Sequence, residues 1–120
     1  MSKKIVITGI GMLTAVGNGK DASWAAIKAG TPGISRISKF DPSRCTCQVG
    51  AEIKNFEEYA IGGGLLDKKS ARKMALFSQY AVATAVEAWK DAGMALPGSE
   101  EGFHPDMDRV GTMLGNGIGG

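Results

Sequence analysis

The stretch KKIVITGIGML, residues 3–13, decides how this chain is interpreted. Its apolar run over residues 5–7 is typical of a strand that is buried on both faces. Two glycines follow at positions 9 and 11, and the glycine-rich pattern continues to Gly17 and Gly19. We therefore predict a strand over residues 3–10 and a loop over residues 11–18.

The last stretch, RVGTMLGNGIGG over residues 109–120, repeats this pattern of an apolar run followed by glycines. It predicts a second strand over residues 109–115 that leads into a tight turn. A buried strand normally delivers its loop to another element of the fold. We therefore expect the chain to be the first part of a larger protein, with strand edges and apolar surface left uncovered when it is alone.

Two helices are predicted between these strands. Residues 21–29 read as a short helix that ends at Gly30, where a left-handed C-cap is needed. Residues 67–92 contain neither glycine nor proline, and their apolar residues recur at helical spacing. A weak alternation over residues 48–53 predicts a further strand. The order of the strong elements, strand, helix, helix, strand, indicates an α/β layer fold.

Composition limits the size and class of the protein. With 120 residues, of which 43% are apolar and 22% charged, the chain has room for one domain at most. Its 18 glycines are twice the usual share of about 7%, and their clustering predicts many tight turns. The formal net charge of +2 gives no indication of nucleic-acid binding.

The sequence also predicts a cellular location. Lys3 and Lys4 are not followed by an apolar stretch of the length that a secretory signal needs. No apolar run is long enough to span a membrane. Cys45 and Cys47 are one residue apart, a spacing at which a disulfide is strained. These features together predict a protein of the reducing cytoplasm that does not contact membranes.

The pair Gly9 and Gly11 after a strand raises the hypothesis of a dinucleotide site. That fingerprint needs a third glycine at position 14 and a helix that starts at once. Position 14 is a threonine, and the sequence predicts a loop to Asn18. A turn with structural glycines is the favoured interpretation, and an unrelated nucleotide-binding module stays as an alternative.

A basic cluster lies at the start of the predicted helix over residues 67–92. Lys69, Arg72 and Lys73 stand at i, i+3 and i+4, so they share one helical face. Like charges at this spacing repel one another, and cations at a helix N-terminus oppose the helix dipole. The cluster is either a solvated charged face or a surface for an acidic protein or a phosphate.

The final glycines surround one bulky side chain, Ile118. Glycine allows a backbone to approach a ligand closely and to adopt positive φ. One interpretation is a tight turn with Ile118 in the core. The other is a ligand pocket that Gly117 borders and Ile118 fills or gates.

Other reactive side chains are interpreted as bystanders. A nucleophilic cysteine needs a neighbour that lowers its pKa, and the sequence offers none near Cys45 or Cys47. A zinc site on these thiols would need two further ligands, and His104 is only one. We therefore expect Cys45 and Cys47 to be neither nucleophiles nor, with His104, a metal site. The larger aromatic side chains are expected to anchor the core: Trp24, Phe77, Tyr80 and Trp89.

Four of these motifs, in this order, resemble one protein family. They are IVITGIG at residues 5–11 with Val16-Gly17-Asn18, Trp24 leading to Ala29-Gly30, DKKSARKM at residues 67–74, and the terminal GNGIGG. The chain is similar over nearly its whole length to the start of a β-ketoacyl-acyl-carrier-protein synthase of type II. The resemblance implies an α/β thiolase-like fold, of which residues 1–120 would be the first, incomplete half and a truncated part of the N-terminal domain.

The resemblance also implies a function. Such enzymes take an acyl group from acyl carrier protein onto a cysteine and condense it with decarboxylating malonyl-acyl carrier protein, without a cofactor. The family's cysteine and its two histidines belong to later sequence, so the segment alone is expected to be inactive. Lys69, Arg72 and Lys73 match residues that dock acyl carrier protein, and Gly117 and Ile118 match the acyl pocket. The family usually has serine at the position of Asn116.

The resemblance further implies a homodimer for the full-length protein and a role in fatty-acid elongation. Two alternative functions on the same fold stay open. One is a ketosynthase of a polyketide pathway, which performs the same chemistry on another substrate. The other is a chain-length-factor-like subunit that keeps the fold and lacks the nucleophile.

Overall fold

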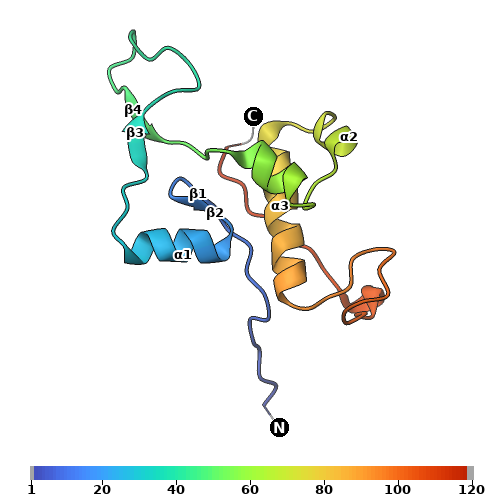
Figure 1. Cartoon of the computed structure of the whole chain (residues 1–120). Coiled ribbons are helices and arrows are strands. Elements are labelled where there is room, and N and C mark those ends of the chain that lie inside the picture. The colour runs from blue at the N-terminus through green and yellow to red at the C-terminus, as the bar shows by residue number, and fades with distance from the viewer. Residues whose placement is uncertain (1, 119–120) are drawn as a thin grey trace.

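The computed structural model describes residues 2–118. Helix α3 (Leu76–Asp91) lies at the centre, and the other elements are arranged around it (Figure 1). The remaining elements are α1 (Lys20–Lys28), α2 (Lys68–Ala71), the antiparallel pair β1 (Leu13–Thr14) and β2 (Gly17–Asn18), the antiparallel pair β3 (Ile34–Arg36) and β4 (Val49–Ala51), the π-helical turn η1 (Glu58–Gly62) and the 3₁₀ turn η2 (Met107–Arg109).

The predicted strand over residues 3–10 is wrong. The N-terminal end of this segment runs extended away from the body, its last residues Gly9 and Ile10 reach α3, and no strand pairs with it within the described part of the chain (Figure 1). Ile5 is 97% exposed. An apolar, β-favouring sequence becomes a strand only when a neighbour accepts its backbone hydrogen bonds. The predicted loop over residues 11–18 instead contains the short β1–β2 hairpin.

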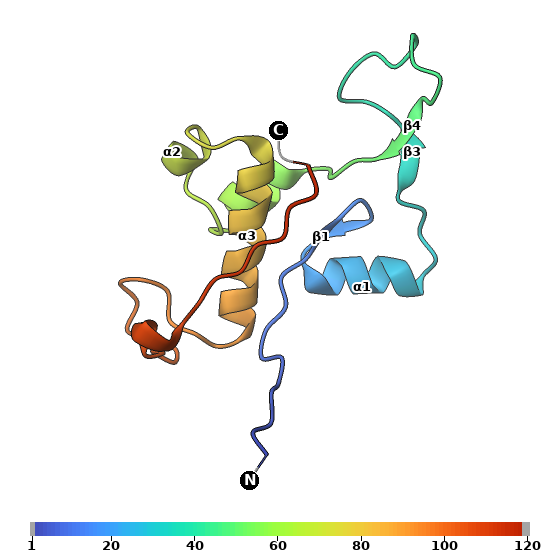
Figure 2. The same cartoon turned by 180° about the vertical axis from the view of Figure 1, so that it is seen from behind.

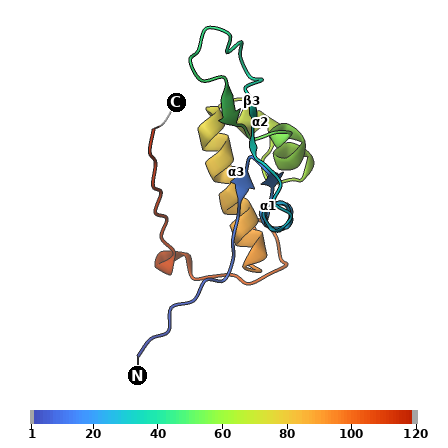
Figure 3. The ribbon, with the colours of Figure 1, turned by 90° about the vertical axis from the view of Figure 1, so that its left-hand side faces the viewer.

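The predicted strand over residues 109–115 is also wrong. Its start belongs to η2, and the following residues run extended along the length of α3 (Figure 2). The described sheets contain no partner for this segment, and Met113 is 98% exposed. In side view this segment and η1 lie on opposite sides of α3 (Figure 3). Residues 3–10 and 109–115 are therefore not strands for the same reason, because neither has a neighbouring strand among the described residues.

The single helix predicted over residues 67–92 is two helices, α2 and α3. The Asp67 carboxylate caps α2 by accepting hydrogen bonds from the backbone of Lys69 and Ser70. The chain then becomes extended at Ala75, where ψ is 153°. Gln79 fills the break, because its amide donates to the carbonyl oxygens of Ala71 and Met74, both at 3.0 Å. The glutamine replaces helical hydrogen bonds that the break removes.

The other local predictions are confirmed. Helix α1 covers the predicted range 21–29 almost completely, and Gly30 follows it with φ at +68°. Gly93 follows the end of α3 with φ at +70°. Strand β4 lies within the range predicted from the alternation over residues 48–53.

The buried core is small and lies between η1, α2 and α3. Phe56 is its largest member at 8% exposure, and its ring meets Tyr80 edge-on with 4.6 Å between the ring centroids. The radius of gyration is 17.0 Å, whereas a compact domain of this length would have about 14 Å. The described residues thus form an elongated piece of mixed α/β structure.

Much apolar surface is uncovered, as the sequence predicts. Large apolar side chains are exposed in both terminal segments and on α1, β3 and β4. Of the four predicted aromatic anchors, Tyr80 and Trp89 are half-buried, whereas Trp24 is 58% exposed and Phe77 is also exposed. Those two predictions are wrong, because no described element covers the outer side of α1 or the first turn of α3.

Candidate functional site

The basic cluster lies on and after the single turn of α2. Lys69, Arg72 and Lys73 are all exposed, and none forms an ion pair with a carboxylate among residues 2–118. Only Lys69 lies within α2, whereas Arg72 is the C-cap and Lys73 follows it, so the prediction that the three cations share one face of a continuous helix is wrong. Hydrogen bonds from Ser70 are the main cause that lowers the pKa of Asp67, and the charge of Lys73 adds to the effect.

A cleft of about 360 Å³ opens beside this cluster. Of the three predicted docking residues, only Arg72 lines it; Lys68 and Lys39 supply two further cations, and Glu57 supplies one carboxylate. The rest of its lining is mostly apolar and comes from η1, α2, α3 and the segments before η1: Ile53, Phe56, Ile61, Ala71, Leu76, Gln79 and Tyr80. The site is therefore an apolar depression with cations at its edge.

Lys39 is the residue of this cleft that sequence reasoning missed. Its ammonium donates to the Tyr80 hydroxyl at 3.2 Å and lies 5.9 Å from the centroid of that ring. Lys39 is remote from the cluster in sequence and has no spacing relation to it. Only the fold brings the two together, so no signal in the sequence could have found it.

Gly117 and Ile118 do not line a pocket in the described structure. Ile118 is 96% exposed, and nothing lies within 4 Å of a Cβ added at Gly117. The three residues just before them, 114–116, face the first half of α3 across a mainly apolar cavity of about 340 Å³. The α3 side of this cavity is formed by Phe77, Ser78, Ala81 and Val82.

The glycines at 9 and 11 have a structural role. A Cβ added at Gly9 would overlap the Ala88 carbonyl oxygen and come within 2.7 Å of the Ala92 nitrogen. A Cβ added at Gly11 would overlap the Thr84 carbonyl oxygen in the same way. Both glycines therefore let this segment lie directly on the backbone of α3. This agrees with the structural interpretation of the pair.

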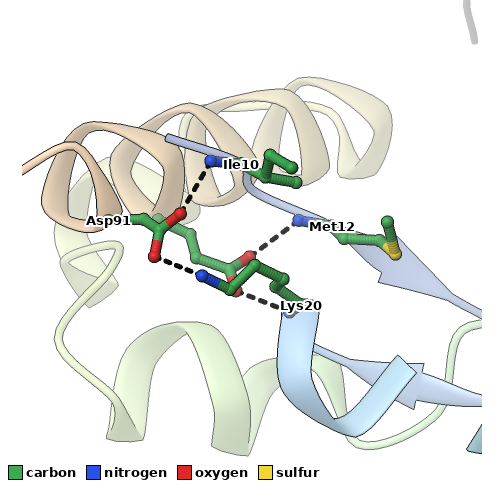
Figure 4. A network of polar contacts seen from close by, with 5 residues as sticks. Ile10, Met12, Lys20 and Asp91 are labelled. Carbon is green, nitrogen blue, oxygen red and sulfur yellow. Dashed lines mark hydrogen bonds and ion pairs between the residues drawn. The ribbon is translucent and has the colours of Figure 1, made fainter. Parts of the chain in front are cut away.

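Two carboxylates of α3 fix the same segment. The Glu87 carboxylate accepts hydrogen bonds from the backbone N–H groups of Met12 and Lys20, both at 2.8 Å (Figure 4). The Asp91 carboxylate accepts from the Ile10 N–H at 2.9 Å and forms an ion pair with the Lys20 ammonium (Figure 4). One helical turn separates the two acids, which is the spacing that presents both to one segment.

The pKa values around this network follow from its contacts. The hydrogen bond with Asp91 is the main cause that raises the pKa of Lys20, and the reciprocal bond lowers the pKa of Asp91. Burial, together with the Glu87 carboxylate, raises the pKa of Tyr59 to about 12. The network is a structural clamp, because each of its polar groups already has a partner within the chain.

The remaining reactive side chains form no site in the described residues. Cys45 and Cys47 are free and exposed, and His104 is exposed. Residues 2–118 hold no cluster of three or more side chains that could bind a metal ion. Within the same range, no helix has the length and apolarity needed to cross a membrane.

Comparisons with known proteins give a consistent result. The family model "Beta-ketoacyl synthase, N-terminal domain" matches residues 2–120. The chain is 40% identical over 123 residues to 3-oxoacyl-[acyl-carrier-protein] synthase 2 of Vibrio cholerae, covering 100% of this chain and 27% of that protein. It is 36% identical over 118 residues to the protein of that name in Coxiella burnetii, covering 98% of this chain and 26% of the relative. The chain thus spans about a quarter of the length of these relatives.

Proposed function

The chain belongs to the β-ketoacyl synthase family, and we propose that it is the N-terminal part of a 3-oxoacyl-acyl-carrier-protein synthase of type 2 that elongates fatty acids. Membership implies a thiolase-like fold. The observation that carries the proposal is the match over residues 2–120 together with the relatives' shared name. The exposed apolar segments 5–7 and 113–118 support a longer protein, in which further strands would cover them.

The proposed reaction is a decarboxylating condensation. An active-site cysteine accepts the acyl group from acyl carrier protein as a thioester. Malonyl-acyl carrier protein then loses carbon dioxide, and its carbanion attacks the thioester carbonyl and releases the cysteine thiolate. Donors that are already in place stabilise the oxyanion that develops. We place the cysteine and two assisting histidines beyond residue 120, so residues 1–120 alone would be inactive.

We assign docking of acyl carrier protein to Lys69, Arg72 and Lys73. The support for this assignment is that all three cations are exposed and form no ion pair within residues 2–118. The three cations also lie within five residues of one another, so their like charges repel. An acidic protein would relieve this repulsion and be steered toward the surface, and the effect would weaken as salt is added.

We assign Gly117 and Ile118 to the acyl pocket. The cavity between residues 114–116 and the first half of α3 supports this role, because an apolar space begins directly before them. In the longer enzyme, Ile118 would then limit the length of the bound acyl chain. We also propose that the longer enzyme is a homodimer.

The docking assignment can be tested in the full-length enzyme. Lys69→Glu combined with Arg72→Glu should raise the KM for acyl carrier protein substrates about tenfold or more at low salt, because each reversal turns attraction into repulsion. Activity on small acyl thioesters should be unchanged. Lys28→Glu on α1 is the matched control, since it reverses an exposed lysine away from the cluster. An equal loss with both kinds of substrate would assign the cluster a structural role.

A further inference from the structure

We propose that the cleft beside α2 seats an apolar side chain of the acidic carrier protein, and that Lys39 is a further cation of that docking surface. This inference rests on the proposed function, because it extends the surface assigned to Lys69, Arg72 and Lys73. It adds a residue that lies outside the basic cluster in sequence. It also gives the surface an apolar centre, where sequence reasoning found only charge.

The floor of the cleft is apolar and ordered. Phe56 and Tyr80 hold each other edge-on, and Phe56 belongs to the buried core. Leu76 stands at the start of α3, lines the cleft and is 46% exposed. A side chain that enters the cleft would therefore remove exposed apolar surface from water without any rearrangement of the core.

Lys39 is held in position before any partner arrives. The Glu52 carboxylate accepts hydrogen bonds from the backbone N–H groups of Ser38 and Lys39 and from the Ser38 hydroxyl. At its other end, the Lys39 ammonium donates to the Tyr80 hydroxyl. A lysine fixed at both ends loses less freedom on binding than an unrestrained surface lysine.

The charges at the rim define the chemistry of the partner. Lys39, Lys68 and Arg72 line the cleft against one carboxylate, Glu57. A volume of about 360 Å³ accommodates one or two side chains and not a whole domain. An apolar side chain flanked by acidic residues on a helix satisfies both conditions, since it fills the floor and pairs with the rim. We therefore assign the cleft to an acidic amphipathic helix of the carrier protein.

Two substitutions in the full-length enzyme separate charge from apolar contact. Lys39→Glu should weaken the Kd for acyl carrier protein about threefold to tenfold at low salt, and the loss should shrink at high salt. Leu76→Gln keeps the size of the side chain and helix propensity and removes the apolar contact. It should weaken the Kd about threefold to tenfold at any salt concentration.

Matched controls stand elsewhere on the chain. Lys28→Glu reverses a lysine that also lies over an aromatic ring, that of Trp24 at 5.7 Å, and should leave the Kd unchanged. Ile34→Gln on β3 removes an apolar side chain that is 68% exposed and should also leave the Kd unchanged. The far-UV circular dichroism spectrum should be unchanged in all four variants, which shows that they fold.

The outcomes distinguish this inference from the proposed function. If Lys69→Glu with Arg72→Glu weakens binding while Lys39→Glu or Leu76→Gln binds normally, the cleft proposal is overturned and the docking assignment survives. If the unsubstituted enzyme does not bind acyl carrier protein, both fail. A third result would also overturn the proposal. If decanoate binds the enzyme saturably, and Leu76→Gln abolishes that binding but leaves the Kd for acyl carrier protein unchanged, the cleft is a site for a small amphiphilic anion.

Discussion

Two glycine-rich apolar segments lie against α3, and they are held there in different ways. In residues 9–19, Gly9 and Gly11 rest directly on the helix backbone, and the carboxylates of Glu87 and Asp91 accept the N–H groups of Met12 and Ile10 (Figure 4). Residues 111–118 run along another side of the helix and make no hydrogen bond to it within the described structure (Figure 2). Their side chains are exposed.

The difference shows what glycine and apolar content leave undetermined. Both segments combine apolar residues with several glycines, so the sequence predicts a strand that leads into a glycine-rich loop or turn at each of them. The first segment is fixed because Gly9 and Gly11 meet the helix backbone and because two acids of α3 face its N–H groups. A Cβ added at Gly111, Gly115 or Gly117 would meet nothing within 4 Å. The contacts that α3 offers to a segment, and not the composition of the segment itself, therefore decide whether it is fixed against the helix.

The largest expected effect comes from filling the contact at Gly11. In Gly11→Ala, the new Cβ would overlap the Thr84 carbonyl oxygen and lie 2.9 Å from the Ala88 nitrogen. Backbone atoms of a helix cannot move aside easily, so we expect the free energy of unfolding to fall by about 3 kcal/mol. Urea denaturation of the full-length enzyme measures this change.

Gly62→Ala is the control for that experiment. Gly62 does not have positive φ, and nothing lies within 4 Å of its added Cβ. Its substitution should change the free energy of unfolding by less than about 0.5 kcal/mol. Equal losses at Gly11 and Gly62 would contradict the close approach of residues 9–19 to α3.

The next effect comes from removing an acceptor of the clamp. Glu87→Ala leaves the N–H groups of Met12 and Lys20 without their carboxylate. A half-buried donor that loses its partner costs about 1–3 kcal/mol, so stability should fall by this amount. Hydrogen exchange at the Met12 and Lys20 amides should accelerate in the variant and report the local release directly.

Glu101→Ala is the control that tests whether removing any acidic side chain accelerates hydrogen exchange at these amides. Its side chain is exposed and makes no hydrogen bond within the described residues. Exchange at the Met12 and Lys20 amides should be unchanged in this variant. Slow exchange at both amides in Glu87→Ala would instead mean that the glycine contacts alone hold the segment.

The sequence predicted those elements whose causes are local. Helix α1 and the glycines that end α1 and α3 follow from spacing and backbone preference. The break between α2 and α3 was not predicted, because residues 67–92 contain no residue that forbids a helix. It depends on Asp67 as a cap and on Gln79 as a replacement donor, and both roles become visible only when the turn exists.

The candidate site was predicted in part for the same reason. The basic cluster has a spacing that can be read from the sequence, so Arg72 was found at the cleft. Lys39 reaches the cleft through its hydrogen bonds to Glu52 and Tyr80, which are 13 and 41 residues away in sequence. The pocket roles of Gly117 and Ile118 stay predictions, because they depend on surroundings beyond the described residues.

The smallest expected effect is the pH dependence of the Lys20–Asp91 ion pair. The pKa of Asp91 is lowered from 3.8, so its stabilisation is present above 3.8 and is lost as the pH falls through the lowered value. The pKa of Lys20 is raised from 10.5, so its stabilisation is present below 10.5 and is lost as the pH rises through the raised value. Both groups lie at the surface, where water and salt screen the pair.

The difference in the free energy of unfolding between the native enzyme and Asp91→Asn should therefore be constant between pH 3.8 and pH 10.5. It should shrink as the pH falls well below 3.8 or rises well above 10.5. Lys20→Met should remove the alkaline change and leave part of the acid change, because the Ile10 N–H still donates to Asp91. Urea denaturation of the three proteins across this pH range measures the differences. An acid change that disappears completely in Lys20→Met would mean that the Ile10 hydrogen bond adds nothing, and that the two segments at α3 differ less than the structure indicates.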